Sequence, residues 1–196
     1  MNITSQMVKE LRDKTNAGMM DCKKALGETD GDLEKAVDLL RQKGLAVAAK
    51  RAGRETKEGV VVSYIHAGGK LGVMVEVGCE TDFVAKTDDF KAFAKDIAMH
   101  IAAVNPLALS RDEVPSDVLQ REKDIYINQA LESGKPPQIV EKMIGGKVEK
   151  YLAEICLLEQ KYVKNDQLTI QDLLNELVAK MGENISIKKF ARFQIG

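Results

Sequence analysis

Two runs of alternating apolar and polar residues, separated by a pair of glycines, constrain the fold of this chain most strongly. Residues 60–66 alternate, and the alternation resumes over residues 71–77. A period of two is typical of β-strands that bury one face, and Gly68-Gly69 between the runs supplies the residues of a tight turn. The pattern therefore predicts a β-hairpin.

The sequence after the hairpin predicts one long helix, then a last helix and a third strand. Thr87, followed by Asp88 and Asp89, is typical of a helix start, and a stripe at helical spacing continues until Asn105-Pro106; its members are Phe90, Phe93, Ala94, Ile97 and Ile101. Residues 169–181 predict the last helix. Residues 185–195 alternate as a strand, with a possible slip at Lys188-Lys189. The expected fold class is α+β, with a core of a small three-stranded antiparallel sheet packed with helices.

The first 44 residues predict three short helices. Asp21 is a candidate cap for the second helix, Gly31-Asp32 opens the third, and Gly44 is a fitting end for it. Residues 46–57 are rich in Ala, Lys and Arg and suit a solvated helical linker. We therefore expect one domain over residues 1–55 and a second over residues 56–196.

Residues 116–158 predict a projecting helical arm within the second domain. Two charged helical segments, 116–132 and 137–158, flank the turn sequence Gly134-Lys135-Pro136-Pro137. This order of elements indicates a helical hairpin.

Composition argues against several classes of protein. The net charge is −1, so the overall balance favours neither direct nucleic-acid binding nor a membrane surface. The cysteines, Cys22, Cys79 and Cys156, are odd in number and widely separated, as expected in a reducing compartment. The sequence shows neither a signal peptide nor an apolar run of about 20 residues that could span a bilayer. We expect a cytoplasmic protein.

The sequence shows no pattern of catalytic or metal-binding residues. It lacks a phosphate-binding GxxxxGK[ST] loop, and His66 and His100 are the only histidines, neither in a nucleophile motif. We interpret the histidines as partly buried polar residues rather than metal ligands. We predict no catalytic residue, no cofactor and no metal site, and hence a protein that is not an enzyme.

Phe83 has two interpretations. It could begin the core of the following helix with Asp82 as the cap, or it could be an aromatic knob on a separate short turn. Thr87 is a better cap and Phe90 already supplies the aromatic core, which favours the knob. Met19 and Met20 also have two interpretations, as residues that fill gaps in a small core or as an adaptable contact surface. Two consecutive residues cannot both face inward on a helix, so at least one of them is expected to face outward.

Three segments closely resemble the translation elongation factor Ts family: LRDKTNAGMMDCKKAL (11–26), CETDFVAK (79–86) and KDIAMHIAAVNP (95–106). The resemblance covers essentially the whole chain. It implies a guanine-nucleotide exchange factor that binds elongation factor Tu, both GDP-bound and nucleotide-free, and promotes GDP release during translation elongation. It also implies that the N-terminal helices form a ubiquitin-associated-like bundle.

The resemblance also implies partner-binding residues. Arg12, Met19 and Met20 match positions through which the three-helix domain docks on the GTPase domain. The Thr81-Asp82-Phe83 motif matches the family motif whose phenylalanine intrudes near the nucleotide and magnesium of the partner. These roles come from the family and not from composition.

Longer family members divide two features between two core copies, whereas this chain combines them in one. Tyr64 to Val73 and Ile97 to Pro106, which contain His66 and His100, resemble the second copy, and Cys79 to Lys86 resembles the first. In the second copy the histidines contact another domain of the partner. The chain ends soon after its final strand, so a C-terminal helical module is expected to be missing. A homodimer would restore two copies.

A different class of function remains open, namely a ubiquitin-associated-type adaptor that binds peptides or RNA. Such an adaptor would have no need of the Thr-Asp-Phe turn, and this feature favours the exchange factor.

Overall fold

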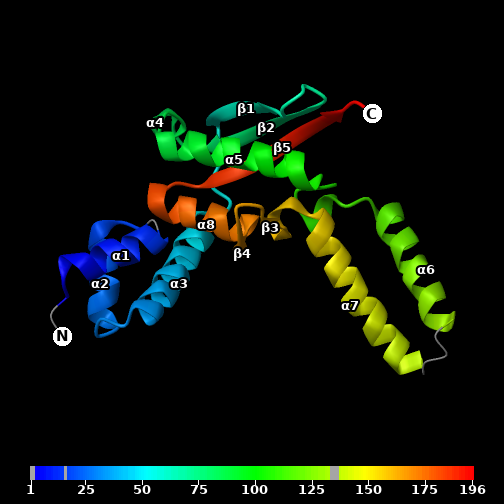
Figure 1. The fold of residues 1–196 in the computed structure, drawn as a ribbon, viewed down its shortest axis with the longest axis horizontal. Helices are drawn as coiled ribbons and strands as arrows, with labels where there is room; N and C mark the ends of the chain where they lie inside the picture. The colour runs from blue at the N-terminus through cyan, green and yellow to red at the C-terminus, as the bar shows by residue number, and fades with distance from the viewer. Residues whose placement is uncertain (1–2, 16, 133–136) are drawn as a thin grey trace. The chain divides into compact units, whose positions relative to one another are not determined.

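The computed structural model describes residues 3–15, 17–132 and 137–196. The α-helices, drawn in Figure 1, are α1 (Ser5–Thr15), α2 (Met19–Glu28), α3 (Leu33–Arg51), α4 (Asp82–Ala85), α5 (Asp88–Val104), α6 (Ser116–Glu132), α7 (Pro137–Ile155) and α8 (Ile170–Met181). The strands are β1 (Glu58–Ile65), β2 (Leu71–Cys79), β3 (Lys161–Tyr162), β4 (Asn165–Thr169) and β5 (Ile185–Gln194). Two short 3₁₀ turns, η1 (Arg111–Glu113) and η2 (Leu157–Glu159), complete the elements.

The chain divides into two compact units. The first unit comprises Met1–Ser63, Met74–Asp96 and Asp172–Phe190, and the second comprises Tyr64–Val73, Ile97–Gln171 and Ala191–Gly196. Each unit therefore contains one end of the three-stranded sheet and one half of α5.

In the first unit, α1, α2 and α3 pack around a small apolar cluster. Its buried members are Val8, Leu11, Cys22, Ala25, Leu26 and Ala36. Asp32 caps α3 by accepting a hydrogen bond from the Lys35 N–H at 3.1 Å, as the sequence predicts. The three predicted helices are confirmed.

Two details of this helical segment differ from the sequence prediction. Gly18, not Asp21, precedes α2, and Asp21 lies in the first turn, where its charge still favours the helix N-terminus. Helix α3 continues through Gly44 to Arg51. Gly44 does not end α3 because the Ala-rich residues beyond it favour helix, so about half of the expected linker is helical.

The predicted hairpin of β1 and β2 is confirmed, and β5 completes a sheet of order β1-β2-β5. Gly68 and Gly69 in the turn have φ angles of 90° and 70°, which non-glycine residues rarely adopt. The contact of Lys189 with Glu76 and that of Ile195 with Lys70 show that β5 runs antiparallel to β2. The fold is α+β, as expected.

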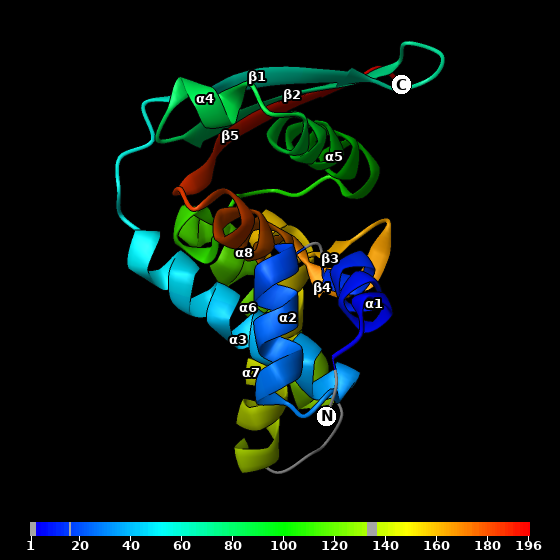
Figure 2. The same ribbon diagram turned by 90° about the vertical axis from the view of Figure 1, so that its left-hand side faces the viewer.

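Helix α5 covers one face of this sheet (Figures 1 and 2). The Thr87 hydroxyl caps it by accepting from the Phe90 N–H at 3.3 Å, and the whole predicted stripe of α5 is buried. Alternate residues on the other face of the sheet are exposed, including Val61 and Met74 in the first unit and Ile65 and Phe193 in the second. In β5 the alternation of buried and exposed residues breaks at the predicted place, because Lys188 and Lys189 are both exposed.

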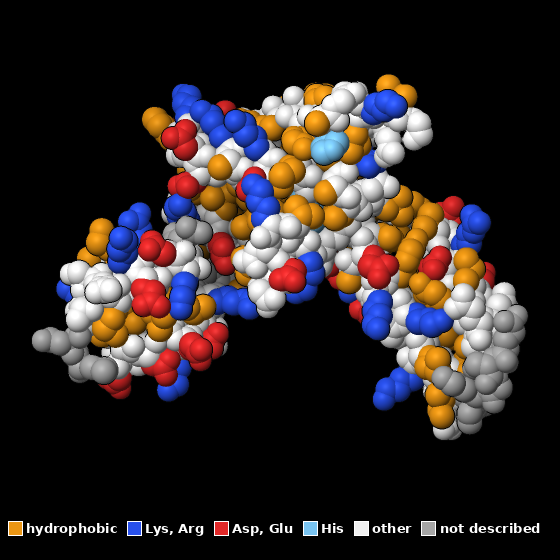
Figure 3. All heavy atoms as spheres, viewed as in Figure 1, with side chains coloured by type: hydrophobic (Ala, Val, Ile, Leu, Met, Phe, Trp, Pro, Cys, Tyr) orange, Lys and Arg blue, Asp and Glu red, His pale blue; other side chains and the backbone are white. Residues whose placement is uncertain are grey.

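In the second unit, α6 and α7 form the predicted helical arm. Val148, Leu152 and Cys156 are its buried core, and acidic and basic side chains are interspersed over both helices with hydrophobic side chains between them (Figure 3). Helix α7 ends at Ile155, three residues before the predicted end, and η2 follows it. The predicted turn at Gly134-Lys135-Pro136-Pro137 lies largely outside the described residues.

The sequence analysis missed the two-stranded sheet of β3 and β4. The strands pair antiparallel, with Lys161 opposite Thr169 and Tyr162 opposite Asn165. Strand β3 has two residues, which is too short for an alternating pattern to be recognised.

Candidate functional site

The Thr81-Asp82-Phe83 motif lies at the end of β2, on the separate four-residue helix α4 in the first unit. Thr81, not Asp82, caps this helix, since its hydroxyl accepts from the Val84 N–H at 3.5 Å. Val84 and Ala85 are buried, whereas the Phe83 side chain is 78% exposed. Of the two sequence interpretations, the aromatic knob is therefore the one that the structure has.

Asp82 lies beside the knob and forms an ion pair with Lys86, with Oδ2 and Nζ 2.5 Å apart. The hydrogen bond from Lys86 lowers the pKa of the Asp82 carboxyl from its ordinary value. Both side chains are largely exposed, so this pair is weak and can exchange its partners easily. The turn thus presents an aromatic ring beside an ionised carboxylate.

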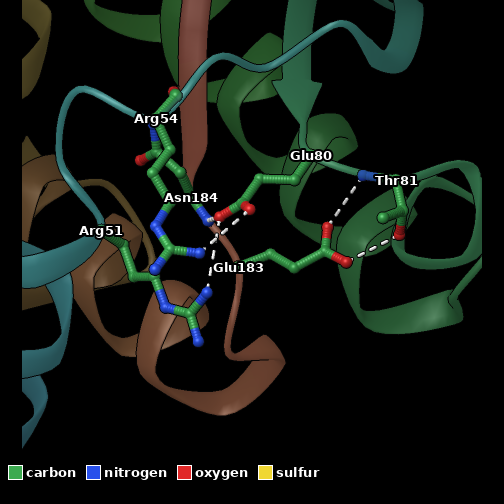
Figure 4. Close-up of polar contacts among 6 residues, drawn as sticks. All are labelled: Arg51, Arg54, Glu80, Thr81, Glu183 and Asn184. Atoms are coloured by element: carbon green, nitrogen blue, oxygen red, sulfur yellow. Dashed lines mark hydrogen bonds and ion pairs between the residues drawn. The ribbon is translucent and has the colours of Figure 1, made fainter.

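A set of polar contacts holds the base of this turn (Figure 4). Both Glu183 carboxylate oxygens accept from Thr81, one from the backbone N–H at 3.0 Å and the other from the hydroxyl at 2.6 Å. Glu80 accepts from the Asn184 N–H at 2.6 Å. The main chain that carries the knob is therefore tied to the loop between α8 and β5.

Arg51, the last residue of α3, and Arg54, just beyond the helix, complete these contacts. Arg54 lies 3.5 Å from Glu80 Oε2, and Arg51 lies 3.8 Å from Glu80 Oε1. The hydrogen bond from Asn184, aided by the charges of both arginines, lowers the pKa of the Glu80 carboxyl from its ordinary value. Glu80 is therefore ionised at neutral pH.

Cys79 adds one more contact to the turn. Burial, aided by the nearby Glu183 carboxylate, raises the pKa of the Cys79 thiol to about 11. The thiol therefore stays protonated, and it donates to the Thr81 carbonyl with Sγ and O 3.1 Å apart.

Arg12, Met19 and Met20 lie on the three-helix part of the first unit. Met19 is 62% exposed and Met20 is 75% exposed, both in the first turn of α2, and Arg12 is exposed on α1. The sequence argument required at least one methionine to face outward, and both do. Large exposed apolar side chains of this kind are typical of contact surfaces.

His66 and His100 both lie in the second unit, and their surroundings differ. His66 is exposed at the hairpin turn, with Nδ1 3.1 Å from the Tyr64 hydroxyl. It borders a hollow of about 590 Å³ whose lining includes Tyr64, Lys70, Met99 and Arg192. Of these lining residues, only His66 was predicted from the sequence to contact the partner.

His100 is fully buried, although the sequence predicted a partly buried residue. Its Nδ1 accepts from the Val163 N–H at 3.4 Å, so Nε2 carries the proton and donates to Gln160 Oε1 at 3.1 Å. Burial lowers the pKa of His100. A neutral imidazole with both ring nitrogens engaged links α5 to the segment after α7.

Sequence reasoning missed Glu183 and Asn184. Thr81 and Glu183 are 102 residues apart, so no local pattern could pair them. The available signal was only that Gly182 follows a predicted helix end, which indicates a turn there. Among the described residues, no cluster of three or more His, Cys, Asp or Glu side chains could hold a metal ion.

No helix within the described ranges is long and apolar enough to cross a membrane.

Comparison with known proteins adds an independent observation. The family model described as "Elongation factor TS" matches residues 1–196. The chain is 76% identical to "Elongation factor Ts" of Desulfotalea psychrophila over the full length of both proteins. It is 63% identical to that of Desulfosudis oleivorans, covering 99% of this chain and 98% of the relative. It is 57% identical to that of Fervidobacterium nodosum over the full length of both. Matches of this extent show that this chain belongs to the elongation factor Ts family.

Proposed function

We propose that this chain is a guanine-nucleotide exchange factor for elongation factor Tu, and that it acts by binding rather than as an enzyme with an active site of its own. Family membership supports the role of exchange factor, and one structural observation supports the mechanism. Phe83 is 78% exposed on a turn whose backbone is held by buried and partly buried groups. A large apolar ring held in water is unfavourable for the free chain, which suggests that it is buried on binding.

In this proposal Phe83 and Asp82 enter the GTPase domain near the bound nucleotide and its magnesium. Their intrusion disturbs the contacts that retain GDP. Binding equilibria are reciprocal. An exchange protein that binds the nucleotide-free partner more tightly lowers the affinity of the partner for GDP, and GDP lowers the affinity of the partner for the exchange protein by the same ratio. Because the chain is released unaltered, it accelerates exchange without changing the overall equilibrium between the bound nucleotides.

The direct test is stopped-flow release of fluorescently labelled GDP from elongation factor Tu, with and without this chain. We expect the release rate to rise with the concentration of the chain and then saturate. If the chain is shown to bind elongation factor Tu and the release rate stays unchanged at saturating concentrations of the chain, the exchange function is excluded. Binding of free peptides or RNA instead would support the adaptor alternative.

We propose that residues 1–55 form the docking domain, with Arg12, Met19 and Met20 in the contact. The paired change Met19→Ala and Met20→Ala should weaken the affinity for elongation factor Tu while leaving the maximal release rate nearly unchanged. Leu45→Ala, which removes another exposed apolar side chain of the helical segment, is the matched control. If the methionine double variant and Leu45→Ala bound elongation factor Tu with equal affinity, the methionines would not be part of the interface.

We propose a different role for each histidine. His66 is exposed and suited to a direct contact with a second domain of the partner, whereas buried His100 supports that surface from within. The variant His66→Ala should therefore lower affinity without lowering stability. The variant His100→Ala should lower stability first, since it leaves Gln160 and the Val163 N–H without their buried partner.

We also propose that the chain works as a homodimer in the cytoplasm. One observation motivates the dimer: the sheet face opposite α5 leaves apolar side chains exposed in each unit, and apolar faces are typical of stable dimer interfaces. Light scattering should show twice the chain mass at micromolar concentration, and Phe193→Glu should reduce it to one chain. A wild-type monomer with full exchange activity would refute the dimer.

Shared sites can be tested by mixing Phe83→Ala chains with His66→Ala chains, each deficient alone. If each elongation factor Tu meets Phe83 of one protomer and His66 of the other, subunit exchange creates one intact site per heterodimer. Recovered activity would support sharing, and activity equal to the mean of the two variants would refute it.

A further inference from the structure

We propose that Glu183 is a positioning residue for Phe83. Its carboxylate fixes Thr81, so that the exposed ring points in one direction before the partner arrives. The functional part of this inference rests on the proposed exchange activity, whereas the clamp itself is a property of the free chain.

Every polar group of Thr81 is engaged within the chain. The N–H and the hydroxyl both donate to Glu183, at 3.0 and 2.6 Å. The carbonyl accepts from the Cys79 thiol at 3.1 Å and from the Ala85 N–H at 3.3 Å. Although the sequence analysis assigned Thr81 to the partner contact, these bonds favour a role beneath the contact surface.

The direction of the Thr81 hydroxyl is set by its hydrogen bond to Glu183. A hydroxyl has one proton and two lone pairs. Because the proton is directed at Glu183, the lone pairs remain available to accept from the Val84 N–H, 3.5 Å away. Glu183 therefore orients the cap of α4, a helix of only four residues that has little stability of its own.

Glu183 is itself held in place by its neighbours in the chain. Helix α8 ends at Met181, and Gly182 turns the chain with a φ of 70°. Asn184, the residue after Glu183, donates its N–H to Glu80 at 2.6 Å and its side-chain amide to the Arg54 carbonyl at 2.7 Å. The two segments are therefore joined reciprocally: Glu183 accepts from the Thr81 N–H, and Glu80 accepts from the Asn184 N–H (Figure 4).

The Phe83 ring has little support from neighbouring side chains. With 78% of its surface exposed, the ring is oriented mainly by the backbone on which it sits. A ring held in one orientation loses less conformational freedom on binding, which favours association and exchange. We infer that Glu183 supplies this preorganisation from outside the motif.

The experiment measures two variants and their combination. Glu183→Gln retains one acceptor oxygen and replaces the other with an amide that cannot accept. We expect stimulated GDP release to fall about tenfold, the usual effect of losing one charge-assisted hydrogen bond. In a chain that already has Phe83→Ala, the same change should have almost no further effect, because Glu183 acts through the ring. An equal fall in both backgrounds would overturn the proposal.

Hydrogen exchange on the free chain gives a second measurement that needs no partner. Glu183→Gln should make the amides of Thr81 and Val84 exchange faster while those of α5 stay protected. Unchanged protection of both amides would overturn the clamp even if activity falls. If wild-type chain fails to release GDP at all, the proposed function fails, and this measurement still decides whether the clamp exists.

Two controls separate positioning from general stability. Glu113 also accepts a backbone N–H, from Leu109 at 3.1 Å, and lies in the second unit, so Glu113→Gln is the matched charge control. Thr81→Ser keeps the hydroxyl and should be more active than Thr81→Val, which lacks it and should resemble Glu183→Gln. Should Glu183→Gln fold poorly, this pair of threonine variants tests the same bond from its other side, and equal activity of the two would overturn the proposal.

Discussion

Two short stretches of the first unit begin alike and end in opposite ways. Thr81-Asp82-Phe83 starts α4, and Thr87-Asp88-Asp89-Phe90 starts α5. Each threonine caps its helix, yet Phe83 is 78% exposed and Phe90 is 0% exposed. One additional residue between cap and ring rotates the side chain by about 100°, the angle per residue in a helix of 3.6 residues per turn. The position relative to the cap, and not the residue type, decides which ring is available.

The largest effect should come from removing the buried ring. Phe90→Ala leaves a cavity in the α5 core, and we expect the free energy of unfolding to fall by about 3–5 kcal/mol. Chemical denaturation followed by circular dichroism measures this loss. A loss similar to that of Phe83→Ala would end the distinction between the two rings.

Phe83→Ala should have the complementary effect. Stimulated GDP release should slow by at least tenfold, about 1.4 kcal/mol, while the denaturation midpoint changes little because the ring is mostly in water already. Stopped-flow and denaturation measurements on one preparation provide the comparison. If the Phe83→Ala variant kept full exchange activity but had a much lower denaturation midpoint, Phe83 would be a core residue.

The cap of α5 should matter less than its buried ring. Thr87→Ala removes the acceptor for the Phe90 N–H, and we expect a loss of about 1 kcal/mol in the free energy of unfolding. Thr87→Ser, which keeps the hydroxyl, is the control. If both variants unfold alike, the methyl group rather than the cap is responsible.

The smallest expected effect is the pH dependence of the contacts beneath Phe83. The folded pKa of Glu80 is lowered, chiefly by the hydrogen bond from Asn184. Its contribution to stability is therefore complete above the unfolded pKa of about 4.3 and is lost as the pH falls through the lower, folded pKa. Glu80→Gln should flatten the decline of stability in that acidic range. Parallel pH profiles for variant and wild type would show that Glu80 contributes nothing there.

Local patterns predicted most of the elements. The hairpin, the cap and stripe of α5, the last helix and the final strand all follow from periodicity and turn residues within short windows. Predictions failed where local signals were weak, as at the two-residue strand β3, or where a neighbouring sequence overrode one residue, as at Gly44 in α3.

By itself, the sequence determined that Phe83 is surplus to the core of α5 and that at least one of Met19 and Met20 faces outward. It could not determine what holds the knob, because Thr81 and Glu183 are 102 residues apart and nothing in either segment encodes the other. Tertiary structure also decided that His66 is exposed while His100 is buried against Gln160. Side-chain periodicity is a property of one segment, whereas a hydrogen bond between distant segments exists only after the sheet and α8 have brought them together.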